Sequence, residues 1–289
     1  MTAIRIAGAG RMLRAQRAGA RGWLLLLIPA GLLLAVCFAY PLASLLGESF
    51  SDTEPGLANY QRLWESDVFR TVLGRTFVTA GLVCLVCLAL GYPYAYLMTV
   101  VSRRWRDVML VVVLVPFWTS LMVRTFSWLV LLQDNGVVND GLAAVGIGRL
   151  SLIRNTTGVT IGMAQVMLPF AVLPMYAVMQ GIDRRLLQAA ESCGARPAMA
   201  FLRVYVPLSL PGVVAGLSLV FILSLGFFIT PQLLGSPSNA LVAQLMYTQI
   251  TQLGNFGYGA AMGFVLLLAT LLLLALVAGA TRRRPGGTA

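Results

Sequence analysis

The sequence predicts an all-α integral membrane protein, and two observations lead to this fold class. Apolar residues make up 58% of the 289 residues and charged residues only 11%, whereas soluble domains hold roughly 45–50% and about 25%. Residues 204–281 form a run of 78 positions without Asp, Glu, Lys or Arg. Because charged side chains normally cover the surface of a water-soluble fold, such a run is expected to lie in a lipid bilayer.

Six membrane-spanning helices are expected, since a helix of about 20 apolar residues crosses the hydrocarbon core. Strands of a membrane barrel would be about 10 residues long and alternate in character. The uncharged run is too long for one helix, and polar residues at 231–257 divide it into two spans. The first span exceeds the ~7–15 apolar residues of a signal peptide, so it is expected to be an uncleaved anchor. The six spans are about 23–47, 76–100, 108–133, 157–181, 209–230 and 258–280.

The arginines orient these spans, because cytoplasmic loops carry the excess of basic residues. With the N-terminus inside, 15 of the 21 basic residues, all Arg, fall in inner segments and four in outer loops, while Arg75 and Arg124 lie at or within spans. The sequence therefore predicts an N-in, C-in protein with cytoplasmic tails at 1–22 and 282–289 and a long inner loop at 183–208. The net charge of +11 is then a topology signal, and no nucleic-acid partner is expected.

Residue types that are missing argue against several classes of function. The chain has no His, which removes imidazole acid–base catalysis and His metal sites. No Asp or Glu lies inside an expected span, so a proton relay or a sodium site is not indicated. A GxxxxGK[ST] phosphate loop cannot exist without Lys. We therefore expect no cofactor and no metal, and energy for uphill transport would have to come from a partner.

The long inner loop is patterned as two short helices. Asp183 is suited to cap the first, and Gly194 to supply the left-handed turn that ends it. Pro197 fits the first turn of the second helix, which Pro207 and Pro211 are expected to end before the fifth span. Such a helix–turn–helix can sit in a cleft of another protein or lie on lipid headgroups, and its spacing alone leaves both alternatives open.

One motif in this loop is specific. Gln188-Ala-Ala-x3-Gly194 followed by Val204-x-Val-Pro207 resembles the EAA loop of ABC-transporter importer permeases, written EAA-x3-G-x9-I-x-LP. Gln188 stands where the family has Glu, and Val204 and Val206 replace Ile and Leu. In that family the loop docks into an ATPase subunit. The resemblance implies a coupling role for Gln188, Ala189, Ala190, Glu191, Gly194, Ala195, Phe201, Val204 and Pro207.

The resemblance also implies an assembly and a location. Residues 23–281 would form a permease domain of the type I importer kind in the bacterial cytoplasmic (inner) membrane. Its partners would be a second related permease, two ATPase subunits that hydrolyse ATP, an extracytoplasmic solute-binding protein and the lipid bilayer. The chain itself would be a transport subunit rather than an enzyme. A stand-alone secondary carrier or channel and a membrane-embedded enzyme are the alternatives.

Three further segments resemble spermidine/putrescine-type permeases: 116–139, which begins PFWTSLMVRTFSW; 228–235, FITPQLLG; and 91–96, GYPYAY. The resemblance implies a polyamine as the small-molecule substrate. Related permeases carry other small solutes, so an amino-acid-like compound, an opine, a phosphonate or another anion remains an alternative.

The third and fifth spans are expected to line the translocation pathway, and Arg124 is their most informative residue. A charge in the hydrocarbon is costly unless it is paired or faces a polar cavity, so Arg124 either lines the pathway, caps backbone carbonyls or pairs with a partner subunit. Aromatic rings could hold a polyamine by cation–π contacts, yet an arginine suits an anionic or zwitterionic solute at least as well. The expected pathway residues are Phe117, Trp118, Leu121, Arg124, Trp128, Phe228 and Pro231.

Two outer segments have simpler expectations. The acidic segment 48–70 would face the binding protein; the alternative is that its charged side chains are simply exposed to solvent and have no specific role. In 239–253, apolar residues recur at helical spacing, which predicts a short helix at the outer end of the pathway that acts as a gate.

Overall fold

The computed structural model describes residues 28–51 and 56–282. The expected tails, apart from Arg282, and the start of the first expected span lie outside these residues. Every regular element within the described ranges is a helix, which confirms the all-α fold class. These elements are η1 (Ala35–Ala39), α2 (Tyr40–Ser51), α3 (Ala58–Glu65), α4 (Asp67–Val100), α5 (Arg103–Trp118), α6 (Leu121–Leu131), α7 (Val137–Ala144), α8 (Thr156–Met179), α9 (Arg185–Ser192), α10 (Pro197–Ala200), η2 (Phe201–Tyr205), α11 (Val206–Leu225), α12 (Ile229–Leu234), η3 (Pro237–Asn239), α13 (Val242–Tyr247), η4 (Thr248–Gln252) and α14 (Phe256–Arg282).

Among the described residues, five helices are long and apolar enough to cross a membrane, and a bent pair of helices makes a sixth candidate. The bent pair is α5 with α6, which meet at 98°. The five continuous candidates are Ile28–Ser51, Asp67–Val100, Thr156–Met179, Pro197–Leu225 and Phe256–Gly279.

The bent pair differs from the single straight span expected at 108–133. Thr119 and Ser120 are both extended, with ψ of 141° and 132°, and so end the helical path. The hydroxyl of Thr119 donates to the carbonyl of Pro116 at 3.0 Å and satisfies an acceptor that the ending helix leaves free. Hydropathy alone did not reveal the bend, because all of these residues lie inside one apolar stretch.

Two more elements differ from the expected boundaries. The helix of the second expected span begins at Asp67 instead of about residue 76, because the Ser66 side chain accepts from the amide of Phe69 and caps it. The helix that follows the inner loop does not end at Pro207 or Pro211 but runs on to Leu225. The π-helical turn η2 precedes these prolines. The pairing of backbone amides with carbonyls shifts within this turn, so the helix continues past the prolines.

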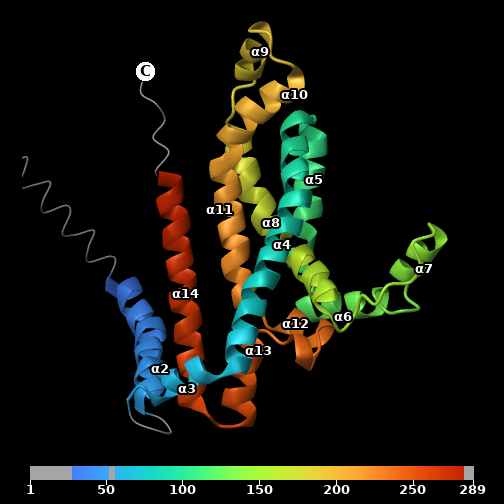
Figure 1. Cartoon of the computed structure of the whole chain (residues 1–289). Helices are drawn as coiled ribbons and strands as arrows, with labels where there is room; N and C mark the ends of the chain where they lie inside the picture. The colour runs from blue at the N-terminus through green and yellow to red at the C-terminus, as the bar shows by residue number, and fades with distance from the viewer. Residues whose placement is uncertain (1–27, 52–55, 283–289) are drawn as a thin grey trace, which may run out of the picture.

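The centre of the structure is formed by α4, α8 and α11, which pack closely (Figure 1). Small residues permit this, as expected between membrane helices. A Cβ atom on Gly216 of α11 would lie 2.7 Å from the carbonyl oxygen of Ala171 in α8, and one on Gly212 would lie 3.0 Å from that of Pro174.

The ends of the helices sort into two groups (Figure 1). The helices α9 and α10 lie at one end, together with the start of α5 and the end of α14. At the opposite end lie α3, α12 and α13, while α7 projects sideways, away from the bundle. The helix α2 packs along α14, to one side of the central three helices. Within the described ranges, the arginine-rich start of α5 and the segment from α9 to η2 therefore lie at the same end, as expected of loops on one side of a membrane.

Candidate functional site

The first part of the site is the inner loop, which folds as two short helices joined by a turn. The amide of Arg185, the first residue of α9, donates to the Asp183 carboxylate at 2.9 Å, although the N-cap position is Arg184 and not Asp183 as expected. Gly194 has φ of +88°, the left-handed conformation in which glycine avoids the steric penalty of a side chain. Pro197 lies in the first turn of α10. The structure thus confirms the expected helix–turn–helix.

The expected coupling residues divide into two groups by exposure. Gln188, Ala189, Glu191 and Gly194 are exposed, and Ala190 and Ala195 are half-buried. No residue of α9 is buried, so this helix is available to a partner along most of its surface.

The second group follows the turn. Phe201 and Val204 are half-buried in η2, and Phe201 packs against the central core, whereas Pro207 is exposed at the start of α11. These residues connect the loop to the bundle rather than offering a free surface.

The second part of the site is a cavity of about 250 Å³ beside the α5–α6 bend. The bend places Phe117, Leu121 and Arg124 around it, although Phe117 belongs to a different helix from the other two. Its remaining lining residues are Pro116, Val166, Met167, Pro169, Phe170, Leu223 and Phe227.

Arg124 is the one charged residue in this lining. Its Nε atom is buried without a hydrogen-bond partner, and its guanidinium forms no hydrogen bond or ion pair with any residue in the described ranges. Capping of backbone carbonyls is therefore not seen within 28–51 and 56–282. An unpaired guanidinium against aromatic and aliphatic walls favours a partner from outside the described chain.

The other expected pathway residues do not gather at this cavity. Trp128 donates from its indole to Gln165 of α8 at 3.4 Å, and Trp118 is 76% exposed. Phe228 packs against Tyr247 with ring centroids 4.9 Å apart, and Pro231 is buried in α12.

Sequence reasoning missed the contribution of α8 to the cavity, and in the expected fifth span it named Phe228 and Pro231, whereas Leu223 and Phe227 line the cavity. Val166, Met167 and Phe170 lie in a helix that is apolar on every side, so no periodicity distinguishes the face that meets the cavity. Pro169 and Pro174 are two prolines within this span, and the helix nevertheless runs unbroken from Thr156 to Met179.

At the opposite end from α9, polar side chains join several helices. The hydroxyls of Thr125 and Thr230 lie 3.3 Å apart, and the amide of Val242 donates to the Thr76 hydroxyl at 3.0 Å. The segment 239–253 contains α13 and η4, which confirms the expected short helix there. A cavity of about 420 Å³ beside it is lined by Gln232, Gly235, Ser236, Pro237, Ala240, Gln244, Leu245 and Thr248.

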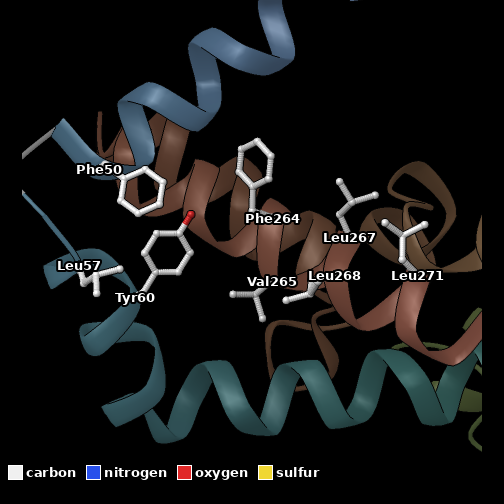
Figure 2. Close-up of a pocket in the computed structure, with 8 residues that line it drawn as sticks. All are labelled: Phe50, Leu57, Tyr60, Phe264, Val265, Leu267, Leu268 and Leu271. Carbon is white, nitrogen blue, oxygen red and sulfur yellow. The ribbon is translucent and has the colours of Figure 1, made fainter. Parts of the chain in front are cut away.

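The acidic segment leads into a different environment. Tyr60 of α3 packs on Phe50 with ring centroids 5.2 Å apart and forms a 2.8 Å hydroxyl contact with Ser49. Figure 2 shows these two rings at one end of a groove of about 370 Å³ that continues along the apolar face of α14. Asp67 pairs with Arg70 at the exposed surface. The groove is lined by uncharged residues, so it offers no counter-charge for a polar solute.

Comparison with known proteins agrees with this geometry. Residues 63–284 match the family described as binding-protein-dependent transport system inner membrane component. The chain is 32% identical over 256 residues to the spermidine/putrescine transport system permease protein PotB of Haemophilus influenzae, which covers 86% of this chain and 88% of the relative. It is 31% identical to PotB of Escherichia coli over 75% of this chain and 80% of that protein.

Relatives with other names and solved structures are also similar. The inner membrane ABC transporter permease protein YdcU of E. coli is 32% identical over 76% of this chain and 74% of that protein. A chain of a bacterial ABC transporter involved in the import of the acidic polysaccharide alginate aligns over 94% of this chain and 99% of its own length, with a TM-score of 0.70 at 20% identity. The helical bundle is therefore that of a multi-pass importer permease. The chain belongs to the family of binding-protein-dependent transport system inner membrane components.

Proposed function

We propose that this chain is a transmembrane subunit of an ATP-driven importer that passes a polyamine, spermidine or putrescine, from a solute-binding protein into the cytoplasm. The observation that carries the proposal is the exposed helix–turn–helix α9–α10, which follows the EAA spacing and leads without a break into the span-length helix Pro197–Leu225. The names of the PotB relatives support the polyamine.

The proposed assembly contains a second related permease and two ATPase subunits, with the N- and C-termini of this chain in the cytoplasm. ATP hydrolysis would take place on the ATPase subunits. Because α9 has no buried residue, an ATPase subunit can bind it without disturbing the core. A shift of α10 would then tilt α11, since the two share one helix, and this would change the walls of the cavity at Leu223 and Phe227.

Arg124 favours a second candidate solute. A cation entering the cavity would meet an unpaired guanidinium, whereas an anionic or zwitterionic solute, such as an amino-acid-like compound, an opine or a phosphonate, would neutralise it. The rings of Phe117 and Phe170, 5.2 Å apart at the cavity, offer faces to a cation. Polyamine transport thus requires that the solute pass those rings while a partner group pairs with Arg124.

Two measurements test the proposal. Calorimetry of the cognate binding protein against spermidine, putrescine, glutamate and a phosphonate identifies the solute, and binding of neither polyamine would contradict the substrate assignment. Uptake into liposomes that contain the assembled complex should require ATP inside. Uptake by this chain alone, without ATPase subunits, would instead identify a stand-alone carrier.

A further inference from the structure

Four aromatic rings meet where the inner end of α4 lies against η2. Tyr96 contacts Phe201 and Tyr205 edge to face, each with ring centroids 5.2 Å apart, and Phe201 stacks on Tyr205 at 5.3 Å. Tyr92, one turn earlier in α4, approaches Phe201 at 6.5 Å. We call Tyr92, Tyr96, Phe201 and Tyr205 the aromatic cluster. Phe201 contacts all three of the other rings, and Tyr96 is the residue of α4 that contacts both rings of η2.

Polar contacts attach the same end of α4 to both sides of the loop. Beyond the turn, the hydroxyls of Tyr92 and Ser209 lie 2.9 Å apart. Before it, the Arg184 guanidinium donates to the backbone carbonyl of Thr99. The segment from Tyr92 to Thr99 therefore holds the loop where it leaves α8 and again where it enters α11.

Between these attachments α9 is the part of the loop least covered by the bundle, although its Leu187 packs against the central core and Ala200 of α10 is buried. No residue of α9 is fully buried, and a Cβ atom on Gly194 would meet no atom within 4 Å. A force applied to α9 and α10 can thus reach the spans by two routes. One is the continuous helix into α11, and the other is the aromatic cluster into α4.

We propose that the aromatic cluster is the link through which the loop moves α4, with Tyr96 as the positioning residue on α4. This inference rests on the proposed coupling role of the loop and adds the element that receives the movement. Edge-to-face rings favour a defined mutual orientation, so they transmit rotation as well as translation. Because α4 packs along α8, with Gly91 against Val172 and Ala171, the movement would reach the centre of the bundle.

The first experiment compares three variants in the assembled complex. Y96A removes the Tyr96 ring, whereas Y96F keeps it and removes only the hydroxyl. That hydroxyl has no partner within the described ranges, so its loss should matter little. L97A truncates the next residue of the same helix, which is 48% exposed, and is the matched control. We expect Y96A to retain ATPase subunits on co-purification and basal ATP hydrolysis, but to lose ten-fold or more of uptake and of the stimulation by loaded binding protein. Y96F and L97A should stay within two-fold of the unmodified complex.

A second measurement follows the movement directly. Spin labels on the exposed Cys193 after α9 and on V100C at the end of α4, 47% exposed, report the distance between loop and helix in a C37S background. If the loop and α4 move as one body, the distance distribution between the two labels is the same with and without bound ATP. In Y96A this distribution is expected to differ between the ATP-bound and ATP-free complexes.

The outcomes separate the link from the function on which it rests. Equal coupling by Y96A and Y96F, or a nucleotide-dependent distance change in the chain with its cluster intact, would overturn the link while leaving the importer intact. Absence of ATP-driven uptake by the unmodified complex would overturn the proposed function and the link together.

Discussion

At the scale of single residues, Arg124 is a charge whose Nε atom is buried without a partner among the described residues; the Nε atom of Arg106, near the start of α5, is in the same condition. A half-buried guanidinium beside aromatic side chains lowers the stability of the isolated chain, because no carboxylate of the described residues offsets the desolvation of its Nε atom. Its side chain therefore reports whether a partner protein or a solute supplies the missing anion.

Arg124→Gln is expected to stabilise the purified chain in nanodiscs by about 1–2 kcal/mol, because it removes an unpaired charge. The measurement is the midpoint of thermal unfolding. Arg149→Gln is the control, since Arg149 is paired with Asp140 and Asn135 at the surface; it should lose at most about 1 kcal/mol. A lower midpoint for Arg124→Gln in the purified chain would contradict the absence of an internal partner. A loss of stability that occurs only in the assembled complex would identify a carboxylate of the second permease.

Gly194→Asp is expected to abolish uptake and coupled ATP hydrolysis while leaving membrane insertion intact. The substitution places a side chain at φ of +88° and a new charge beside the exposed face of α9. Gly148→Asp is the matched control, because Gly148 also has a positive φ of +81° and open space around it, but follows α7, which projects from the bundle away from α9 and α10. Normal uptake of radiolabelled solute by the Gly194→Asp complex would contradict the proposed coupling role of the loop.

At the scale of elements, close packing decides which substitutions the bundle tolerates. Gly216→Ala should destabilise the chain by about 1–3 kcal/mol, because its Cβ would lie 2.7 Å from the Ala171 carbonyl oxygen. Gly81→Ala in α4 meets no atom within 4 Å and should be neutral or stabilising by up to about 1 kcal/mol. Thermal unfolding of the two variants side by side measures the difference. Equal midpoints would show that α8 and α11 are free to separate.

Much of the helical content was predictable because burial in lipid leaves a strong hydropathy signal. The inner loop was predictable in detail, since Asp183, Gly194 and Pro197 act through local backbone rules. The α5–α6 bend was not, because Thr119 and Ser120 end a helix through their conformation and leave hydropathy unchanged. The expectation that Pro207 ends a helix was wrong for a related reason. It rested on the amide hydrogen that proline lacks, whereas the turn η2 before it changes which amides pair with which carbonyls.

The candidate site was predictable in part. The exposed residues of α9 follow a motif that depends on local spacing. The cavity combines residues from three parts of the chain, and Val166 or Leu223 differs from its apolar neighbours solely by position in the folded bundle. The aromatic cluster was not predicted as a contact for the same reason, although Tyr96 and Phe201 were both visible in their motifs.

At the scale of the whole molecule, the grouping of helix ends predicts which cysteines a membrane-impermeant maleimide can reach. In a C37S background, the exposed Cys193 should react in inverted membrane vesicles and stay protected in intact spheroplasts. V145C, at a position 77% exposed after α7, should show the reverse. Labelling of Cys193 in intact spheroplasts would contradict the N-in, C-in orientation.

The bare surface of α9 also bears on the lifetime of the chain in a cell. A helix with no fully buried residue gains less stability from the rest of the fold than the spans do. We therefore expect proteases to cleave after Arg185 in α9 and after Arg196 in the turn that follows, both of which are exposed. A docked ATPase would cover them. Copies made in excess of the ATPase would then be degraded first, which would keep the abundance of this subunit matched to that of its motor.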